Sequence, residues 1–398
     1  MRTILVRRKK YLLAGLMLGC MIALAVHPSA VAAPPVQPSP PGGLGLDGSC
    51  APNGIADLLD RPALQVRRPE KCVLLDVTTA GPRLVAVGER GIVILSDDNG
   101  NTWRQARVPT SVSLTSVDFP SPMQGWAVGH SGVVLHSRDG GQTWERQLDG
   151  ILAARLAYQA AETEQKSLGP DNEAARRQLA AAQLLVKDGA EKPFLDVAFT
   201  NEKVGIIVGA YGLIFHTMDG GETWSSWINR IDNPKGLHFY NLQVDRNLIY
   251  LAGEQGLFCF SDDGGQSFRR ITTPYRGSFF TSTLSKSGKL LVAGLRGNAF
   301  WFDDKTETFT QIAVSDPVSI STAVMGPENL MLFANQSGQI LAYREQNNEI
   351  DAVETPRVAQ VAALALLNDG TLITAGVCGI IGFRLPTDNP GSKTGGAQ

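Results

Sequence analysis

The residues in this chain that could do chemistry begin with aspartates in a repeated setting. A Ser or Thr stands two positions before each of these aspartates. A Thr or Ser stands four positions after it, and an aromatic residue stands five positions after it. Such carboxylates could bind calcium or transfer protons. A short carboxylate also accepts backbone N–H bonds inside a turn, and a device that recurs in unit after unit normally serves the fold. We therefore interpret these aspartates as structural, with a catalytic or calcium role as the alternative. They are Asp98, Asp139, Asp219 and Asp263, and the aromatic residues that pack between blades beside them are Trp103, Trp144 and Trp224.

These aspartates belong to a seventeen-residue pattern that repeats along the chain. Its clearest copy is VGHSGVVLHSRDGGQTW at 128–144, and further copies begin at 87, 208, 252, 293, 334 and 375. The second glycine of the pattern advances by 41, 80, 44, 41, 41 and 41 residues. A period near forty with several short strands per unit is typical of a β-propeller, in which neighbouring blades bury each other's faces. The repeats predict an all-β, seven-bladed β-propeller over residues 50–386.

Each unit has the pattern of four short strands. A G-x-x-G turn joins strands two and three, where glycine adopts backbone angles that other residues reach at a cost. A D-G-G turn joins strands three and four. The last unit ends after three strands, before Pro386. We expect residues 63–68 to pair with it as the fourth strand, because this would close the ring and cover the exposed edge.

The double step of 80 residues contains an insertion at 151–190. Apolar residues recur at helical spacing on both sides of a Gly-Pro-Asp-Asn turn at 169–172, which predicts a hairpin of two helices. The apolar positions are Leu152, Leu156, Ala160 and Leu168, then Ala175, Leu179, Ala182 and Val186. The hairpin joins strand four of blade two to strand one of blade three, so we expect it on or beside the face with the G-x-x-G turns. It is either a docking arm or an insertion that only packs on the ring.

The loops of that face contain the candidate binding residues. Guanidinium groups and tyrosines suit the recognition of carboxylates and polar protein surfaces. The turns and the crossings between blades contribute Arg90, His130, Tyr211, Arg230, Tyr275, Arg276 and Arg296. The alternative for most of them is a solvated loop that binds nothing.

The first 32 residues have the pattern of a secretory signal. Four basic residues at 7–10 precede an apolar stretch at 11–26, and small residues at 30–32 suit cleavage. Cys20, after Leu-Gly, leaves a lipoprotein as an alternative, and an uncleaved membrane anchor is a third. A Pro- and Gly-rich linker follows at 33–49, and residues 387–398 form a polar tail. We predict an exported, periplasmic protein.

The net charge and the cysteines indicate which class of protein this is. Without residues 1–32 the chain has 31 Lys and Arg against 38 Asp and Glu, so it lacks the basic character of a nucleic-acid-binding protein. Export brings the thiols into an oxidising compartment. Cys259 lies in an apolar strand and should be a buried free thiol. Cys50, Cys72 and Cys378 lie near the ring closure, where a disulfide from Cys72 to either of the others would staple it.

The chain shows no recognisable catalytic or cofactor motif. A P-loop, zinc-ligand spacing and a dinucleotide fingerprint are missing, and the histidines at 130, 136, 216 and 238 form no ligand pattern. The segment FRLP at 383–386 resembles the F-R-I-P motif of sialidases, but it follows the last repeat instead of preceding the first. We predict no enzyme activity, cofactor or metal, with a sialidase- or glycosidase-like enzyme or a lectin as the alternative.

The repeats resemble a known family. The turn motif matches the Asp-box of bacterial-neuraminidase-repeat propellers. The segments at 125–144 and 208–224 are similar to the photosystem II assembly and stability factor family of cyanobacteria and chloroplasts, and related propellers also occur in bacteria without a photosystem. The resemblance covers about residues 73–385. It implies an exported propeller that binds a new reaction-centre subunit through an arginine-bearing face, and hence an assembly accessory or binding scaffold for a membrane or envelope protein complex.

Overall fold

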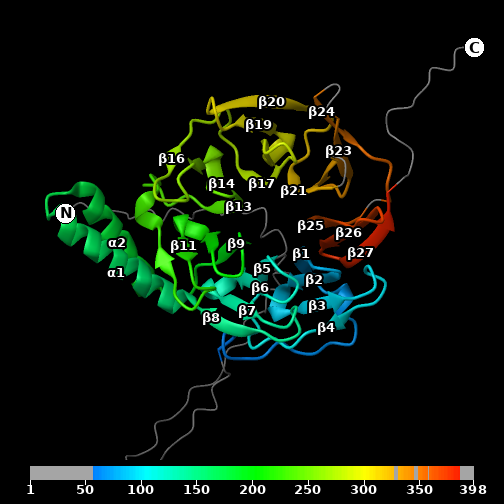
Figure 1. The fold of residues 1–398 in the computed structure, drawn as a ribbon, viewed down its shortest axis with the longest axis horizontal. Coiled ribbons are helices and arrows are strands. Elements are labelled where there is room, and N and C mark those ends of the chain that lie inside the picture. The colour runs from blue at the N-terminus through cyan, green and yellow to red at the C-terminus, as the bar shows by residue number, and fades with distance from the viewer. Residues whose placement is uncertain (1–56, 327–329, 345–347, 357, 386–398) are drawn as a thin grey trace, which may run out of the picture. The chain divides into compact units, whose positions relative to one another are not determined.

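The computed structural model describes residues 57–326, 330–344, 348–356 and 358–385. Its strands form antiparallel blades that are arranged in a ring, and two helices extend from one side of the ring (Figure 1). The predicted seven-bladed propeller with a helical hairpin is therefore confirmed. The first four blades consist of β1 (Leu74–Ala80), β2 (Arg83–Gly88), β3 (Val93–Ser96) and β4 (Arg104–Gln105); β5 (Leu114–Asp118), β6 (Gly125–Gly129), β7 (Val134–Ser137) and β8 (Glu145–Leu148); β9 (Phe194–Phe199), β10 (Gly205–Gly209), β11 (Ile214–Thr217) and β12 (Ser225–Ser226); and β13 (Phe239–Asp245), β14 (Leu248–Gly253), β15 (Phe258–Ser261) and β16 (Arg269–Arg270).

The remaining blades complete the ring. They consist of β17 (Phe279–Leu284), β18 (Leu290–Gly294), β19 (Ala299–Asp303) and β20 (Thr308–Val314); β21 (Ile320–Met325), β22 (Met331–Asn335), β23 (Ile340–Arg344) and β24 (Glu349–Ala352); and β25 (Val361–Leu366), β26 (Thr371–Gly376) and β27 (Gly379–Arg384). Strand β20 also pairs in parallel with β24, which joins blades five and six into one sheet of eight strands.

Burial explains why the second and third strands of a blade are so apolar. Every residue of β6, β7 and β10 is buried, because each blade is covered on both faces by its neighbours. The outer strands β4, β12 and β16 have only two residues each and are largely exposed. Seven hydrophobic clusters of described residues lie between adjacent blades, including one between the last blade and the first.

The ring does not close in the way that the strand count predicts. Ala63 N donates to Val108 O at 3.0 Å, and Gln65 Nε2 donates to Ala106 O at 3.2 Å. Residues 63–66 therefore lie beside blade one, and the prediction that they complete blade seven is wrong. The physical reason is that the short strand β4 leaves the backbone after Gln105 available for pairing. Closure comes instead from β25, which contacts β1 through the cluster that includes Leu74 and Ala375.

Side chains cap the N-termini of both helices of the hairpin. In α1 (Gly150–Leu168) the Asp149 carboxylate accepts from Ile151 N and Leu152 N, both at 3.0 Å. In α2 (Glu173–Asp188) Asn172 Oδ1 accepts from Ala175 N at 3.0 Å. Neither of these helices is long and apolar enough to span a membrane.

The buried face of the hairpin agrees with the prediction at Ala175 and Ala182 and differs from it at Leu152, Leu168 and Val186. Small side chains are buried along it: Ala153, Ala154, Ala157, Ala161, Ala175 and Ala182. By contrast Leu152, Leu168 and Val186 are exposed by 44%, 53% and 46%. Alanines on the inside allow the two helices and the ring to approach closely, so the larger apolar side chains remain on the outside.

The described cysteines are free thiols. Cys259 is buried, as predicted, and burial raises its pKa to about 12. Cys72 and Cys378 are not bonded to each other, so that version of the predicted disulfide is not formed. The Cys72 thiol instead points to Arg68 O at 3.9 Å within its own turn. Cys50, the other predicted partner, lies outside the described residues, as do 1–49 and 387–398.

Candidate functional site

In the first five blades the turn between strands two and three places one side chain at an unusual backbone position. Arg90, Tyr211 and Arg296 have φ of 57°, 58° and 57°, and Ser131 and Gln255 occupy the same position in blades two and four with φ of 56° and 54°. This left-handed region is costly for residues other than glycine, and such strain is often found at functional sites. We call these five residues the corner residues.

Close packing explains why the turn takes this form. A Cβ on Gly88 would lie 2.1 Å from Val73 O, and one on Gly91 would lie 2.1 Å from Thr110 O. The glycines on both sides of the turn therefore press against the crossings between blades, and only the two residues between them can carry side chains. Arg90, Tyr211 and Arg296 are exposed as a result.

The turns and crossings together form one face of the ring, which we call the loop face. A Cβ on Gly256 would lie 2.2 Å from Tyr275 O, and a Cβ on Gly297 would lie 2.8 Å from Asp316 O. The first residue of α1 belongs to the same face, because Gly150 lies against Ser131 O and against Ala190. The hairpin thus starts from the loop face, as predicted from its position in the repeat.

A cluster of ionisable and aromatic side chains lies on the loop face of blades three and four. Lys192 Nζ is 4.8 Å from the centroid of the Tyr211 ring, whose centroid is 5.0 Å from that of His238. His238 Nδ1 is 3.2 Å from Glu254 Oε2. Burial lowers the pKa of His238, although Glu254 opposes this, and burial raises the pKa of the neighbouring Tyr240 to about 12.

The other predicted binding residues have different environments. Arg276 is exposed, whereas His130 is half-buried and burial lowers its pKa. Tyr275 donates its hydroxyl to Leu295 O at 2.7 Å and packs on Phe279, so it ties two loops together. Arg230 stacks on Trp227 with 4.5 Å between the guanidinium carbon and the ring centroid, and it donates to Gly265 O at 2.6 Å.

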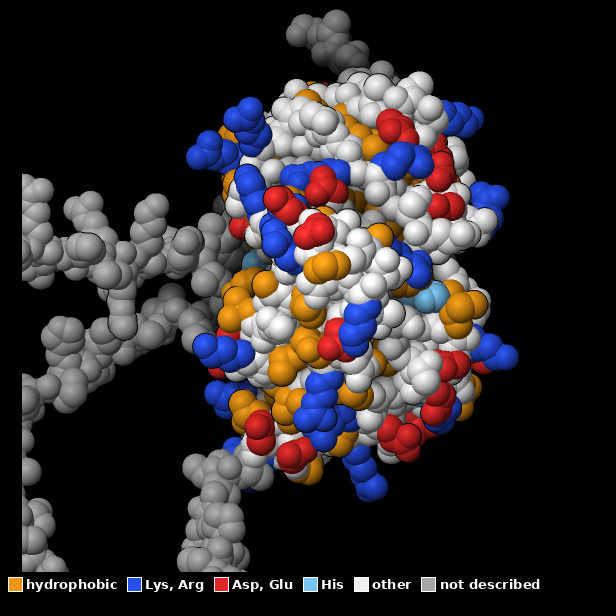
Figure 2. Space-filling model, turned by 90° about the vertical axis from the view of Figure 1, so that its left-hand side faces the viewer, with side chains coloured by type: hydrophobic (Ala, Val, Ile, Leu, Met, Phe, Trp, Pro, Cys, Tyr) orange, Lys and Arg blue, Asp and Glu red, His pale blue; other side chains and the backbone are white. Residues whose placement is uncertain are grey.

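The hairpin and the third blade enclose a groove of about 590 Å³. Alanines of α1 and α2 form one side, and the crossing from Ser226 to Gly236 forms the other, with Tyr211 at the rim. Large apolar side chains are exposed along the hairpin itself, namely Ile151, Leu152, Leu168, Leu184 and Val186. Figure 2 shows hydrophobic and basic side chains interspersed on this side of the molecule. The surface is suited to an amphipathic protein segment.

The Asp-boxes lie at the opposite end of the blades, at the turns between strands three and four. Asp98 accepts from Ser96 Oγ, Thr102 N and Thr102 Oγ1 at 2.8, 2.8 and 2.6 Å, and these bonds lower its pKa to about 2. Trp103 Nε1 donates to Gly100 O at 3.0 Å. Asp139, Asp219 and Asp263 repeat the arrangement. Both oxygens are used inside the turn, which supports a structural reading.

Sequence reasoning missed three half-buried acids on the inner strands, namely Asp76, Asp118 and Asp196. Asp76 Oδ2 accepts from Val117 N at 2.8 Å, and Asp196 Oδ2 accepts from Leu242 N at 2.8 Å, so each carboxylate bonds to the next blade. Burial raises the pKa of Asp118 to about 6 and that of Asp196 to about 7. An acid inside an otherwise apolar inner strand is the signal that could have found them. In the described parts of the chain no group of three or more His, Cys, Asp or Glu side chains could hold a metal ion.

Comparisons with known proteins agree with this architecture. The family model described as "Photosynthesis system II assembly factor YCF48" matches residues 61–162 and 176–276, and the gap between the two matches falls in the hairpin. The photosystem II assembly lipoprotein Ycf48 of Synechococcus sp. (strain RCC307) is 46% identical over 61 residues, which are 15% of this chain and 18% of that protein. The aligned part is thus less than a fifth of this relative.

Solved structures of the same family show the same fold. A structure of YCF48 bound to D1 peptide has a TM-score of 0.58 at 17% identity and covers 82% of this chain and 100% of that one. YCF48 from Cyanidioschyzon merolae has a TM-score of 0.55 at 16% identity and covers 81% and 98%. Because the family model matches more than half of the 398 residues, the chain belongs to the photosynthesis system II assembly factor YCF48 family.

Proposed function

We propose that this protein is an exported, non-catalytic scaffold that binds a subunit of a membrane or envelope protein complex and helps to assemble or stabilise it. Family membership supports an assembly role, and the described site supports binding without covalent chemistry. The observation that carries the proposal is the loop face. It holds Arg90, Tyr211 and Arg296 exposed, at a strained backbone position that glycine would occupy at lower cost.

The client in this proposal is a polypeptide segment of a membrane protein. A YCF48 structure was solved with a D1 peptide bound, which supports peptide recognition by this type of propeller. Arginine and tyrosine suit a segment with carboxylates or exposed backbone oxygens. The groove beside α1 and α2 adds an apolar surface, so we propose that the hairpin is a docking arm for the same client.

The experiment is capture of the client from gently solubilised native envelopes with a C-terminally tagged protein, followed by mass spectrometry. One variant replaces residues 151–190 with a short Gly-Ser linker. Its ends can be joined without disturbing the ring, because Gly150 and Ala190 are neighbours. A second variant combines Arg90→Gly, Tyr211→Gly and Arg296→Gly. Glycine removes the side chains and relieves about 1 kcal/mol of strain at each corner, so this variant should stay folded.

The matched control for the corner variant is Asn99→Gly. Asn99 also has a left-handed backbone, with φ of 58°, but it lies in an Asp-box turn at the other end of blade one. We expect a membrane protein complex to be captured by the unaltered protein and by the control, and to be lost from the corner variant. Equal capture by all four proteins, or no specific capture by any, would contradict the proposal.

Export and anchoring can be tested separately. We propose that the protein is periplasmic after cleavage of residues 1–32. The named Synechococcus relative is a lipoprotein, so the alternative for this chain is an anchor on Cys20. If residues 1–32 are cleaved off, the mature protein does not contain residue 20, so the variant Cys20→Ala should yield a mature protein of unchanged mass and solubility. A shift of the protein from the detergent phase to the aqueous phase in this variant would instead establish the lipoprotein.

A further inference from the structure

The boundary between blades three and four lacks an aromatic stack that the previous boundary has. Between blades two and three, the Trp126 indole lies between His136 and Phe199, with ring centroids 4.3 and 3.7 Å apart. The equivalent positions at the next boundary are Ile206 for Trp126 and Val244 for Phe199. At this boundary Ile206 and Val244 are smaller than their counterparts, while the buried Trp227 takes the position of Gln147 and stacks on His216.

The histidine of this boundary also lacks its usual partners. His136 Nε2 is 2.8 Å from Gln124 Oε1, and its Nδ1 is 3.2 Å from Gln147 Nε2. The residues equivalent to these glutamines in blade three are Val204 and Trp227, neither of which can replace the hydrogen bonds to the ring. His216 stacks on Trp227 at 4.1 Å between centroids. No side chain or backbone group of the described residues hydrogen-bonds to its ring nitrogens.

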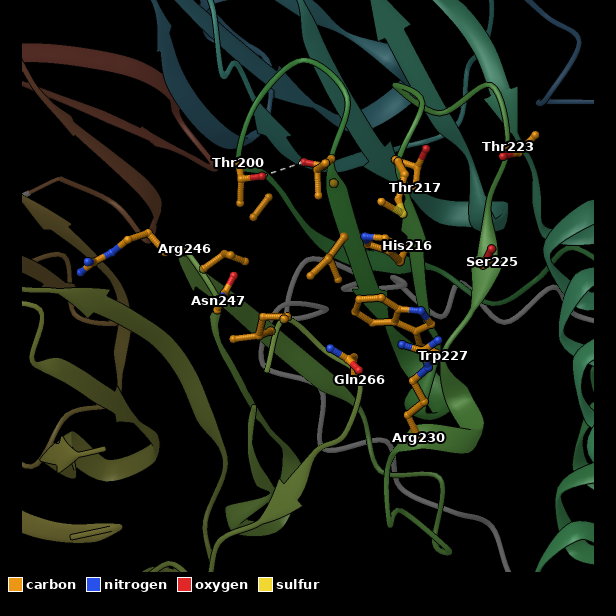
Figure 3. Close-up of a pocket in the computed structure, with 18 residues that line it drawn as sticks. Thr200, His216, Thr217, Thr223, Ser225, Trp227, Arg230, Arg246, Asn247 and Gln266 are labelled. Carbon is orange, nitrogen blue, oxygen red and sulfur yellow. Dashed lines mark hydrogen bonds between the residues drawn. The ribbon is translucent and has the colours of Figure 1, made fainter. Parts of the chain in front are cut away.

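A cavity of about 620 Å³ occupies this boundary, and its size is typical of small-molecule sites. Ile206, Val244 and His216 are among the residues that line it. Figure 3 shows His216 and Trp227 on the side of blade three, with Asn247 and Gln266 on the side of blade four.

The polar groups of the cavity favour a negative charge. Its lining includes Arg230 and Arg246 but no Asp or Glu. Arg230 lies over Trp227 and uses one of its N–H groups for Gly265 O, which leaves other donors. Arg246 points away from the cavity in Figure 3, with 87% of its side chain exposed, and it donates two hydrogen bonds to Asp245, so Arg230 is the cation that faces a ligand. The amides of Asn247 and Gln266 add neutral hydrogen-bonding groups.

We propose that the cavity between blades three and four binds a planar aromatic carboxylate. The ring lies against Ile206 and Val244, a polar ring atom hydrogen-bonds to His216, and the carboxylate lies toward Arg230. The lining residues Thr200, Asn247, Thr223 and Gln266 come from the turns opposite the loop face, whereas Arg230 also lines the groove beside the hairpin, so the two proposed sites share this arginine.

The test uses indole-3-acetate as the probe and titration calorimetry with the full mature protein. Ile206→Trp places at this boundary the side chain that blade two has, and it should weaken binding at least tenfold by filling the cavity. His216→Phe keeps the ring stack on Trp227 and removes one hydrogen bond, so binding should weaken by about tenfold. His136→Phe is the matched control in blade two, and its affinity should equal that of the unaltered protein.

Two further ligands test the assigned chemistry. Indole without the carboxylate and cyclohexylacetate without the flat ring should each bind at least tenfold more weakly than indole-3-acetate. The proposal is overturned if the unaltered protein shows no saturable binding, if cyclohexylacetate binds as well as indole-3-acetate, or if folded Ile206→Trp binds like the unaltered protein. Thermal unfolding shows whether Ile206→Trp is folded. If this variant is unfolded, the affinity of His216→Phe for indole-3-acetate tests the proposal in its place.

Discussion

Acid should destabilise this protein through His136, because a chain of hydrogen bonds holds its ring neutral. The Trp126 indole N–H can only donate, and it donates to Gln147 Oε1 at 3.0 Å. This fixes the Gln147 amide so that its Nε2 donates to His136 Nδ1 at 3.2 Å and to Gly220 O at 2.9 Å. His136 Nε2 must then donate to Gln124 Oε1. A proton on Nδ1 would face an N–H group and break the network.

The size of the effect follows from the pKa of His136. Burial, with Arg138 as the second cause, lowers this pKa from 6.5 to about 4, and only 4% of the residue is exposed. The folded-state pKa is below that of the unfolded chain. The stabilisation is therefore complete above pH 6.5 and is lost as the pH falls from 6.5 to 4, because only the unfolded chain takes up the proton. A shift of this size corresponds to about 3 kcal/mol.

The assay is urea unfolding of the unaltered protein and of His136→Phe at pH 7.5 and pH 4.5. Phenylalanine keeps a ring between the blades but does not titrate. Other groups, such as Asp196, titrate equally in both proteins and cancel in the difference between their unfolding free energies. This difference should move by about 2 to 3 kcal/mol in favour of His136→Phe at pH 4.5. A difference that is the same at both pH values would refute the reasoning.

Four further changes test other parts of the structure. Asp139→Ala removes the acceptor of Thr143 N and Thr143 Oγ1, so urea unfolding should show a loss of about 2 kcal/mol; no loss would argue against a structural Asp-box. For Asp196, burial raises the folded-state pKa to about 7, so the stability of the unaltered protein relative to Asp196→Asn should fall as the pH rises from 4 to 7; urea unfolding at pH 5 and pH 8 measures this, and a constant difference would contradict it. Arg296→Gly should raise the unfolding free energy by about 1 kcal/mol, because φ is 57° there; a decrease would mean that the arginine makes a stabilising contact. Asp149→Ala removes the N-cap of α1, so hydrogen exchange should become faster in the first turn of that helix and stay unchanged in β5 and β9; protection that persists would contradict the capping role.

The repeat made the fold predictable, because each unit needs neighbours on both faces and the spacing of its glycines counts the units. The helical hairpin was equally clear from its spacing and from its turn at 169–172. The path of residues 63–66 was not, because their side-chain pattern suits an edge strand on blade seven as well as one on blade one. The hydrogen bonds of residues 63–66 to Val108, Ala106 and Gln105 distinguish these two edges.

The candidate site was predictable in its location but not in its details. The G-x-x-G motif identifies the turn that holds Arg90, Tyr211 and Arg296, whereas the left-handed backbone of these residues depends on packing against the crossings. Local spacing also cannot bring Lys192 and His238 together with Tyr211, because these three residues belong to different strand connections. Such clusters depend on how adjacent blades are rotated against each other.

The third blade keeps its Asp-box but differs from the second at the boundary with the next blade, and a repeat protein shows its specific sites by such differences. A side chain that occurs at one position in every blade, such as the Asp-box aspartate, is explained by the fold alone. Trp126 and Gln147 become Ile206 and Trp227 one blade later, which opens a cavity and leaves His216 without its partners. The hairpin is inserted before the same blade. The preceding boundary shows that this fold can fill the same positions with stacked rings, so the cavity beside the packed cluster of blades three and four supports the ligand site that we propose.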